Sequence, residues 1–318
     1  MSPAGHDGAV GPAWSDLLRQ AVARLTEAGV DSPRADAEQL LAHVFGADRG
    51  TVLAAVLRGD SAGHAAAQRF EDVVARRAAR TPLQHLTGRT WFHGVELQVG
   101  PGVFLPRPET ETLVELALTA ARERAVKGSL PVCVADLCTG SGAVAAAVAA
   151  GLWREDVTAE VMAVELDPRA HAWARCNLEP HGVELMLGDA YHAWPERNGC
   201  VDVVVSNPPY VPEGRLPTQP EAGLDPALAL YGGDARGTLM PLRVAAAAAR
   251  LLAPGGTLAM EHDETHADEL VADLRAMGVW KSVTGWDDLT GRPRFVTAVR
   301  VPSATDPSVI PELLKMEE

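Results

Sequence analysis

Apolar residues recur at intervals of three and four through the first part of the chain, which is the pattern of amphipathic helices. One face of a first helix carries Leu17, Leu18, Ala21, Leu25 and Ala28. Further helices are predicted over residues 35–45, 50–58 and 62–80. Residues 13–87 are therefore predicted to form a small all-helical bundle, although periodicity alone names no partner for it.

The pattern changes between residues 88 and 108. The segment from Thr90 to Val99 alternates enough to predict a β-hairpin, and Gly100-Pro101-Gly102 then turns the chain. Each proline of Leu105-Pro106-Arg107-Pro108 disfavours helix in the residue before it, so this stretch is predicted to be extended. Residues 88–108 are thus interpreted as an ordered linker.

Short apolar runs alternate with helical patterns over residues 109–300, which predicts an α/β domain whose parallel sheet is covered on both faces. The predicted strands are 132–136, 161–165, 183–187, 201–206, 257–261 and 294–300, and the predicted helices are 109–126, 142–151, 168–179, 236–252 and 265–277. The last strand follows a segment too short for a crossover helix, so it is predicted to be antiparallel. Residues 301–318 are interpreted as a tail.

Composition and charge narrow the class of protein. With 318 residues, 47% of them hydrophobic and 22% charged, the chain resembles an ordinary globular protein of two domains. Its net charge of −14 repels phosphate backbones, so no direct nucleic-acid binding is expected. A protein or a small molecule is the expected partner.

The cysteines and the chain's apolar runs predict neither a metal site nor a membrane span. Cys133, Cys138, Cys176 and Cys200 form no CxxC pair or Cys/His spacing, and are interpreted as buried apolar residues in a reducing compartment. The N-terminus lacks the basic start and apolar core of a signal peptide, and the run 244–252 is too short to span a bilayer. A cytoplasmic location is expected.

A first candidate site is the turn that follows the predicted strand 132–136. Asp136 ends the strand, and the turn continues as Leu137-Cys138-Thr139-Gly140-Ser141-Gly142 before a helix. Glycines at such a turn let the backbone approach a ligand, and the helix N-terminus offers free N–H groups. With only two glycines the match is weak by itself, and an ordinary strand-to-helix turn remains an alternative.

Two carboxylates follow the next strands. Glu165 ends strand 161–165, where it could accept hydrogen bonds from a ribose diol, although a solvated strand-end acid is common. Asp189, after strand 183–187, could accept from an adenine amino group or simply cap a turn. A glycine turn with a diol acceptor fits NAD and S-adenosylmethionine equally.

The tetrad Asn207-Pro208-Pro209-Tyr210 separates these two cofactors. An amide nitrogen is a poor nucleophile, but the Asn207 side-chain oxygen and the Pro208 main-chain oxygen could accept its two N–H bonds and aim it at a sulfonium methyl group. The prolines stiffen the backbone, and Tyr210 can pack against a planar group. The tetrad predicts a methyltransferase for an sp² nitrogen, without a metal; a plain turn is the alternative.

Several motifs together resemble the HemK/PrmC family of protein-(glutamine-N5) methyltransferases, which modify the Gly-Gly-Gln loop of peptide-chain release factors. The resemblance covers about residues 13–300 and rests on Asp136 to Gly142, Ser206 to Tyr210, and segments 82–88, 99–111, 225–234 and 255–261. The tetrad is shared with DNA amino-methyltransferases. Pro106-Arg107-Pro108-Glu109-Thr110-Glu111 is far more specific.

The resemblance implies a class I, Rossmann-like S-adenosylmethionine methyltransferase with a seven-stranded, mostly parallel sheet and a helical N-terminal domain that helps to dock the release factor. A monomer is expected. The implied cofactor-binding residues are Asp136, Cys138, Thr139, Gly140, Ser141, Gly142, Glu165, Asp189, Ala190 and Asn207. The implied catalytic and substrate-binding residues are Asn207, Pro208, Pro209 and Tyr210.

The chain departs from the family pattern at a few positions. Cys138 replaces a glycine, which is a modest change if its φ angle is negative. Ala190 replaces a bulky residue near the adenine, for which Tyr191 could compensate. The other departures are His85, Asp225, Asp263 and His266, and no histidine is given a catalytic role.

Two other functions are weighed against this one. An amino-methyltransferase for DNA adenine or a small molecule would share the tetrad, but a DNA enzyme must flip a base and hold phosphates, which the acidic charge disfavours. A non-catalytic binding module could keep the fold, but it has no need of an intact tetrad, Glu165 and a glycine turn.

Overall fold

The structure is a computed structural model that describes residues 11–215 and 225–302. These residues form two compact units that divide at Arg89. The predicted boundaries at 87/88 and 108/109 stay predictions. Of the predicted tail, residues 303–318 lie outside the described part of the chain.

The first unit is helical, as predicted. Its helices are α1 (Trp14–Glu27), α2 (Pro33–Phe45), α3 (Arg49–Arg58), α4 (His64–Ala78) and the short α5 (Leu83–Thr87). The face predicted from the spacing of leucines is buried, with Leu17 4% and Leu25 0% exposed. These residues pack with Leu40, Leu41 and Phe70 into one core, so the periodic pattern reflects the interior of this unit.

The predicted hairpin is present as β1 (Arg89–Phe92) and β2 (Val95–Gln98), which pair as a separate two-stranded sheet. Arg107 is extended, with φ −96° and ψ 146°, because the proline that follows it disfavours helix. A short 3-10 turn, Pro108–Thr110, leads into α6 (Glu111–Val126). The extended segment therefore leads directly to Thr110 and α6.

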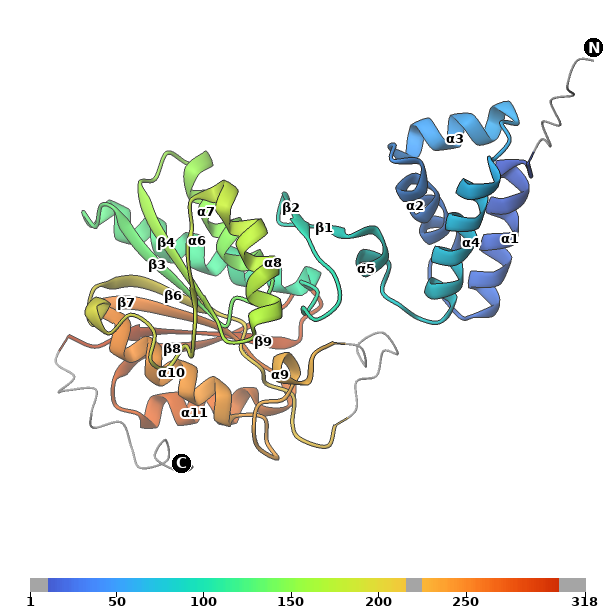
Figure 1. Cartoon of the computed structure of the whole chain (residues 1–318). Coiled ribbons are helices and arrows are strands. Elements are labelled where there is room, and N and C mark those ends of the chain that lie inside the picture. The colour runs from blue at the N-terminus through green and yellow to red at the C-terminus, as the bar shows by residue number, and fades with distance from the viewer. Residues whose placement is uncertain (1–10, 216–224, 303–318) are drawn as a thin grey trace, which may run out of the picture. The chain divides into compact units, whose positions relative to one another are not determined.

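The second unit is built on a seven-stranded sheet with the order β5-β4-β3-β6-β7-β9-β8 (Figure 1). The strands are β3 (Val132–Leu137), β4 (Ala159–Glu165), β5 (Glu184–Leu187), β6 (Val201–Ser206), β7 (Leu252–Glu261), β8 (Trp280–Asp287) and β9 (Pro293–Arg300). The first five of these are parallel, and β9 is antiparallel to both neighbours, as predicted for the last strand. The sequence did not predict β8. The implied Rossmann-like methyltransferase fold is confirmed.

Helices cover both faces of this sheet (Figure 1). The helices α6, α7 (Ala143–Arg154) and α8 (Pro168–Leu178) pack on one face, and α10 (Leu239–Leu251) and α11 (Ala267–Ala276) on the other. The side chains of β3 alternate between the two resulting cores: Val132 and Val134 face one, and Cys133 and Ala135 the other. The central strands β3 and β6 are mostly apolar because they are buried along their whole length.

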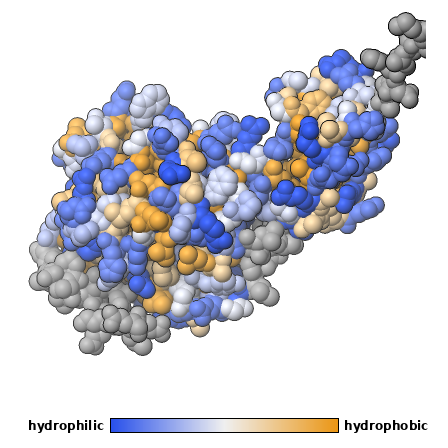
Figure 2. Space-filling model, in the orientation of Figure 1, coloured by the Kyte–Doolittle hydropathy of each residue, from blue (hydrophilic) through white to orange (hydrophobic). Residues whose placement is uncertain are grey.

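The outer surface carries both hydrophobic and hydrophilic residues. On the face shown in Figure 2, hydrophobic residues reach the surface in small groups among hydrophilic ones. Within the described residues no single helix has both the length and the apolar composition to cross a membrane. The bent pair α2 and α3, with 93° between its helices, passes on length and composition alone.

The packing of α6 on α7 gives a test of this core. Leu118 is 2% exposed, and a Cβ atom added at Gly151 would lie 2.8 Å from its Cδ2, so the two helices are in close contact. Leu118→Ala is expected to lower the free energy of unfolding by about 2–5 kcal/mol, because a cavity remains. Val126→Ala is the control, because Val126 at the end of the same helix is 90% exposed. In urea denaturation this variant should change the free energy of unfolding by less than about 0.5 kcal/mol. Equal effects would contradict the packing.

Candidate active site

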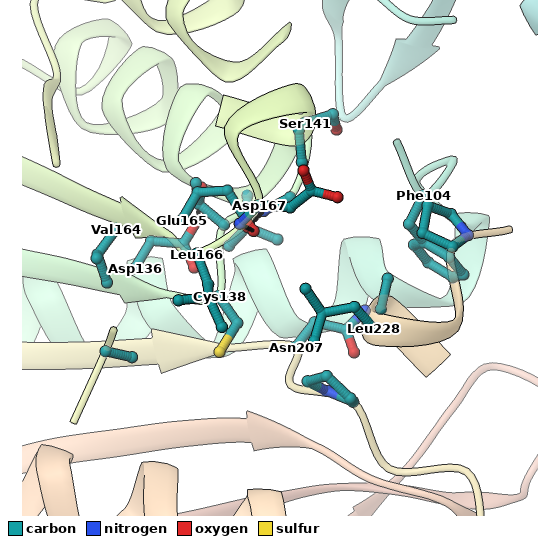
Figure 3. A pocket seen from close by; sticks show the side chains of 18 of the residues that line it. Phe104, Asp136, Cys138, Ser141, Val164, Glu165, Leu166, Asp167, Asn207 and Leu228 are labelled. Atoms are coloured by element: carbon teal, nitrogen blue, oxygen red, sulfur yellow. Dashed lines mark hydrogen bonds between the residues drawn. The ribbon is translucent and has the colours of Figure 1, made fainter. Parts of the chain in front are cut away.

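A pocket opens at the carboxyl ends of the central strands, where the strand order reverses. From β3 the sheet runs to β4 in one direction and to β6 in the other, and this reversal point is where α/β sheets bind ligands. Figure 3 shows Glu165 and Asp167 on the β4 side of the pocket, and Asn207, Leu228 and Phe104 around its other side. The pocket therefore draws on segments that are far apart in sequence.

Asp136 is the one acidic residue of β3, and its side chain holds the turn that follows the strand. Its side chain is 1% exposed, and its Oδ2 accepts hydrogen bonds from Thr139 Oγ1 at 2.6 Å and from the main-chain N–H of Ala145 at 3.2 Å. Burial raises the pKa of Asp136 to about 7. The carboxyl group thus ties the turn to the start of α7 while it also lines the pocket.

Cys138 has a backbone conformation that the sequence did not reveal. Its φ angle is +62°, in the left-handed region that favours glycine. The condition under which its replacement of glycine would be a modest change is therefore not met. A non-glycine residue in this region costs about 1–2 kcal/mol. Burial, together with the nearby carboxylates of Glu165 and Asp136, also raises the pKa of its thiol, so the sulfur stays protonated.

Glu165 lies at the end of β4 and is 9% exposed. Its two oxygens accept hydrogen bonds from the main-chain N–H groups of Gly140 at 2.8 Å and Asp167 at 2.7 Å. Burial raises the pKa of Glu165, and these N–H groups oppose the shift. Because each oxygen has a second lone pair, the carboxylate can still accept from a ligand while it fixes the glycine turn.

Asp189 caps its own turn, the alternative that the sequence left open. Its Oδ1 accepts a hydrogen bond from the main-chain N–H of Tyr191 at 2.9 Å, and both Asp189 and Ala190 line the pocket. The Tyr191 ring lies 5.7 Å from Arg243 Cζ, and Tyr191 is not among the described residues that line the pocket. The pocket wall at this point is therefore formed by Ala190 and Leu166 rather than by the Tyr191 ring.

The tetrad follows β6 and is docked on a later segment. Asn207, Pro209 and Tyr210 line the pocket, whereas Pro208 is buried and lies outside the lining. The main-chain N–H groups of Tyr210 and Val211 both donate to the carbonyl oxygen of Leu230, at 3.1 and 2.7 Å. Leu230 ends α9 (Ala227–Leu230), so this short helix holds the tetrad in place.

Most of the residues predicted to bind the cofactor meet in this one pocket. Its lining includes Asp136, Cys138, Thr139, Gly140, Ser141, Glu165, Asp189, Ala190 and Asn207. Gly142 is the exception among them: it is the N-cap of α7, with φ +82°, and a Cβ atom there would lie 2.8 Å from Leu178 Cγ. At this glycine α7 therefore begins in close contact with Leu178 of α8, and its predicted contact with the cofactor stays a prediction.

Sequence reasoning missed two polar residues behind the tetrad, Thr110 and Glu261. Asn207 Nδ2 donates to Thr110 Oγ1 at 3.5 Å, and Thr110 Oγ1 donates to Glu261 Oε2 at 2.8 Å. Tyr210 Oη donates to the other Glu261 oxygen at 2.9 Å. Glu261 could have been flagged in the way that Glu165 was, since it also ends a parallel strand of the sheet.

Three of the departures from the family pattern, Asp225, Asp263 and His266, make structural contacts. Asp225 forms an ion pair with Arg107 at 2.8 Å, which joins the linker to the segment before α9. Asp263 and His266 form a capping box on the turn Glu264–His266, with the Thr265 N–H donating to Asp263 at 2.9 Å. His85 lies in α5 of the helical unit.

The charge of the pocket distinguishes NAD from S-adenosylmethionine independently of the tetrad. Its described lining includes the carboxyl groups of Asp136, Glu165, Asp167 and Asp189 and no lysine, arginine or histidine. A diphosphate would be repelled by these carboxylates, whereas a sulfonium or ammonium cation would be attracted. The residues present therefore fit S-adenosylmethionine and not NAD.

The φ angle of Cys138 gives a stability test with a defined sign. Cys138→Gly and Cys138→Ala both remove the thiol, but only glycine tolerates φ +62° without strain. The glycine variant is expected to be more stable than the alanine variant by about 1 kcal/mol. Urea denaturation of the two proteins measures the difference. The opposite order, expected where φ is negative, would contradict this backbone conformation.

Comparison with known proteins agrees with this site. Residues 16–88 match the family model described as PrmC N-terminal domain, and residues 134–218 match a methyltransferase domain model. A release factor glutamine methyltransferase of Bifidobacterium longum is 42% identical over 298 residues, with 90% of this chain and 99% of that protein covered. One of Mycolicibacterium smegmatis is 45% identical over 287 residues, with 89% and 96% covered.

Among solved structures, the hMettl16 catalytic domain, crystallised with a MAT2A 3′UTR hairpin, has a TM-score of 0.50 and 14% identity. The match covers 74% of this chain and 83% of that one, and it shows a shared fold only. The assignment of family rests instead on the relatives of over 40% identity that span nearly the whole chain. The chain belongs to the release factor glutamine methyltransferase family.

Proposed function

We propose that this protein transfers a methyl group from S-adenosylmethionine to the side-chain amide nitrogen, N5, of the glutamine in the Gly-Gly-Gln loop of peptide-chain release factors. One observation carries the proposal beyond the family name. Asn207 shares a single pocket with Glu165 and the Gly140 turn, and the pocket's described lining offers carboxylates but no cationic side chain. A polar amide group therefore lies in a site suited to a cationic ligand.

The residues that would hold the cofactor have distinct tasks. Glu165 keeps free lone pairs for a ribose diol, and Asp189 with Ala190 lies where the adenine would bind. The acidic lining stabilises a positive charge in the pocket. When bound, S-adenosylmethionine supplies an electrophilic methyl group on a sulfonium. The turn from Asp136 to Ser141 holds the backbone close to this site.

The tetrad would hold the substrate amide. The Asn207 Oδ1 atom and the Pro208 carbonyl oxygen accept its two N–H bonds, and Tyr210 packs against the planar group. Two acceptors fix the nitrogen in one orientation and stabilise the positive charge that develops on it. The proton becomes acidic once the nitrogen is alkylated, so no strong base is required.

The remaining features of the proposal concern partners and location. We expect the helical domain, predicted at residues 13–87, to help dock the release factor. The net charge of −14 supports a protein substrate rather than a nucleic acid. We further expect a monomer that acts in the cytoplasm.

The proposal is tested by supplying the candidate substrates side by side. The full-length protein and labelled S-adenosylmethionine are incubated with a purified release factor, with duplex DNA and with a metabolite extract. Label in the release factor, located by mass spectrometry to the glutamine of its Gly-Gly-Gln peptide, is the expected result. Label in DNA or in a metabolite alone would support the amino-methyltransferase alternative instead. Calorimetry that shows no binding of S-adenosylmethionine would favour a non-catalytic module.

Removal of the Asn207 amide tests the role of the tetrad. Asn207→Ala is expected to lower kcat for the release factor at least ~100-fold, as does the loss of a preorganised polar contact in other enzymes. Asn198→Ala, at an exposed asparagine outside the pocket lining, is the control and should keep normal turnover. Near-normal kcat in a folded Asn207→Ala protein would refute the role given to the amide.

Gly237 tests whether the tetrad backbone must stay in place. A Cβ atom at Gly237 would lie 2.2 Å from the Tyr210 carbonyl oxygen and 2.9 Å from Pro212 N, and its φ is +78°. Gly237→Ala is expected to displace the tetrad and lower kcat by about 10-fold or more, since small misplacements of reacting groups are costly.

Gly291→Ala is the matched control for this change. Gly291 has a φ of +80°, but nothing lies within 4 Å of its added Cβ atom. Both variants should lose about 1 kcal/mol of stability through the backbone, but only Gly237→Ala should lose activity. Equal kcat values for the two variants would show that the contact with Tyr210 has no catalytic consequence.

A further inference from the structure

Glu261 is a carboxyl group buried behind the tetrad, and no role has been given to it. It ends β7 and is 0% exposed. One oxygen accepts from Thr110 Oγ1 at 2.8 Å, and the other accepts from Tyr210 Oη at 2.9 Å. Each of its oxygens thus contacts a residue that lines the pocket, and Thr110 in turn contacts Asn207.

The order of donors and acceptors along the hydrogen bonds from Glu261 through Thr110 to Asn207 fixes the orientation of the Asn207 amide. An ionised carboxylate only accepts hydrogen bonds, so the single proton of Thr110 Oγ1 must point to Glu261. Thr110 can then only accept from Asn207, and the group that faces it, 3.5 Å away, must be the Nδ2 donor. Oδ1 is left on the pocket side, and no described residue donates a hydrogen bond to it.

The same carboxylate orients the phenol ring. Tyr210 Oη donates to Glu261, and burial with the adjacent Glu261 charge raises the pKa of Tyr210 well above its usual value, so the hydroxyl keeps its proton. Burial is the main cause that raises the pKa of Glu261 to about 7. Arg294 on β9 faces both Tyr210 and Glu261, and its charge lowers the pKa of Glu261, whereas the charge of Glu109 raises it. At pH 8 the carboxyl group is therefore mostly ionised.

We propose that Glu261 is a positioning residue: through Thr110 it holds the Asn207 amide with its oxygen toward the substrate nitrogen, and directly it holds the Tyr210 ring. This inference rests on the proposed glutamine methylation. If Glu261 were neutral or absent, Thr110 Oγ1 could turn its proton toward Asn207. The Asn207 amide could then rotate so that Nδ2, a hydrogen-bond donor, faces the N–H bonds of the substrate amide, which need an acceptor.

Removal of the Thr110 hydroxyl tests this series of hydrogen bonds most directly. Thr110→Val keeps the shape of the side chain and removes the hydroxyl, and Thr110→Ser keeps the hydroxyl. With full-length protein, a purified release factor and labelled S-adenosylmethionine at pH 8, Thr110→Val and Glu261→Gln are expected to lower kcat about 10-fold. A factor of this size is expected for the loss of one hydrogen bond that positions a group next to the reacting atoms. KM should change by less than about 3-fold, and Thr110→Ser should keep most of kcat.

A double-mutant cycle separates positioning from a structural role. In the Asn207→Ala protein there is no amide left to orient, so Thr110→Val should lower kcat there by less than about 2-fold. The matched control is Asp202→Asn, at a buried carboxylate of the same unit that accepts from Arg124 at 2.8 Å and from Cys133 N at 3.0 Å. It should lower the melting temperature and leave kcat unchanged.

The outcomes distinguish the inference from the proposed function. Wild-type protein that does not methylate the release factor would overturn the proposed function. If wild-type protein is active, the inference fails when Thr110→Val lowers kcat by the same factor with and without Asn207. It also fails when Thr110→Val and Glu261→Gln leave kcat unchanged, or when Thr110→Ser is as impaired as Thr110→Val.

Discussion

The parallel pairing of β3 with β6 is the constraint on which the site depends. In this register Leu137 lies opposite Ser206, and the Ser206 hydroxyl donates to the Leu137 carbonyl oxygen at 2.5 Å. The two strands therefore end side by side, and the turn after one and the tetrad after the other leave the sheet at the same point. The helices α7 and α10 pack on opposite faces of the sheet, and such a reversal leaves a crevice at the strand ends. A ligand pocket is the direct consequence of the strand order.

The electrostatics of the pocket follow from what these strand ends carry. Asp136 and Glu165 are both buried, and burial raises the pKa of each, which means that their charged forms are held at a cost in free energy. Main-chain N–H groups offset part of this cost at Glu165. A bound cation would offset more, because it favours the ionised carboxylates. The site is thus organised to gain from a positively charged ligand, and that preference is independent of any comparison with relatives.

The sequence predicted much of this because its strongest signals are local. Alternating apolar runs located the parallel strands, and the tetrad and the Gly140 turn were recognisable from residue types alone. The edge strand β8 was missed because its residues are mostly exposed and polar, with Lys281, Ser282 and Asp287 among them, so it has no apolar run. The φ of Cys138 was not predictable either, because a residue with a Cβ atom favours negative φ and only the folded structure holds this one at +62°.

The partnership of Thr110 with Glu261 was beyond the sequence for a different reason. These residues come from a turn before α6 and from the end of β7, and only the fold brings their oxygens to 2.8 Å. The prolines on either side of Arg107 keep this segment extended, and the segment leads to Thr110 beside the end of β7. The stiff prolines around Arg107 and the hydrogen bond to Glu261 together hold the Thr110 hydroxyl behind the Asn207 amide. The segment before α6 therefore supports the active site through Thr110.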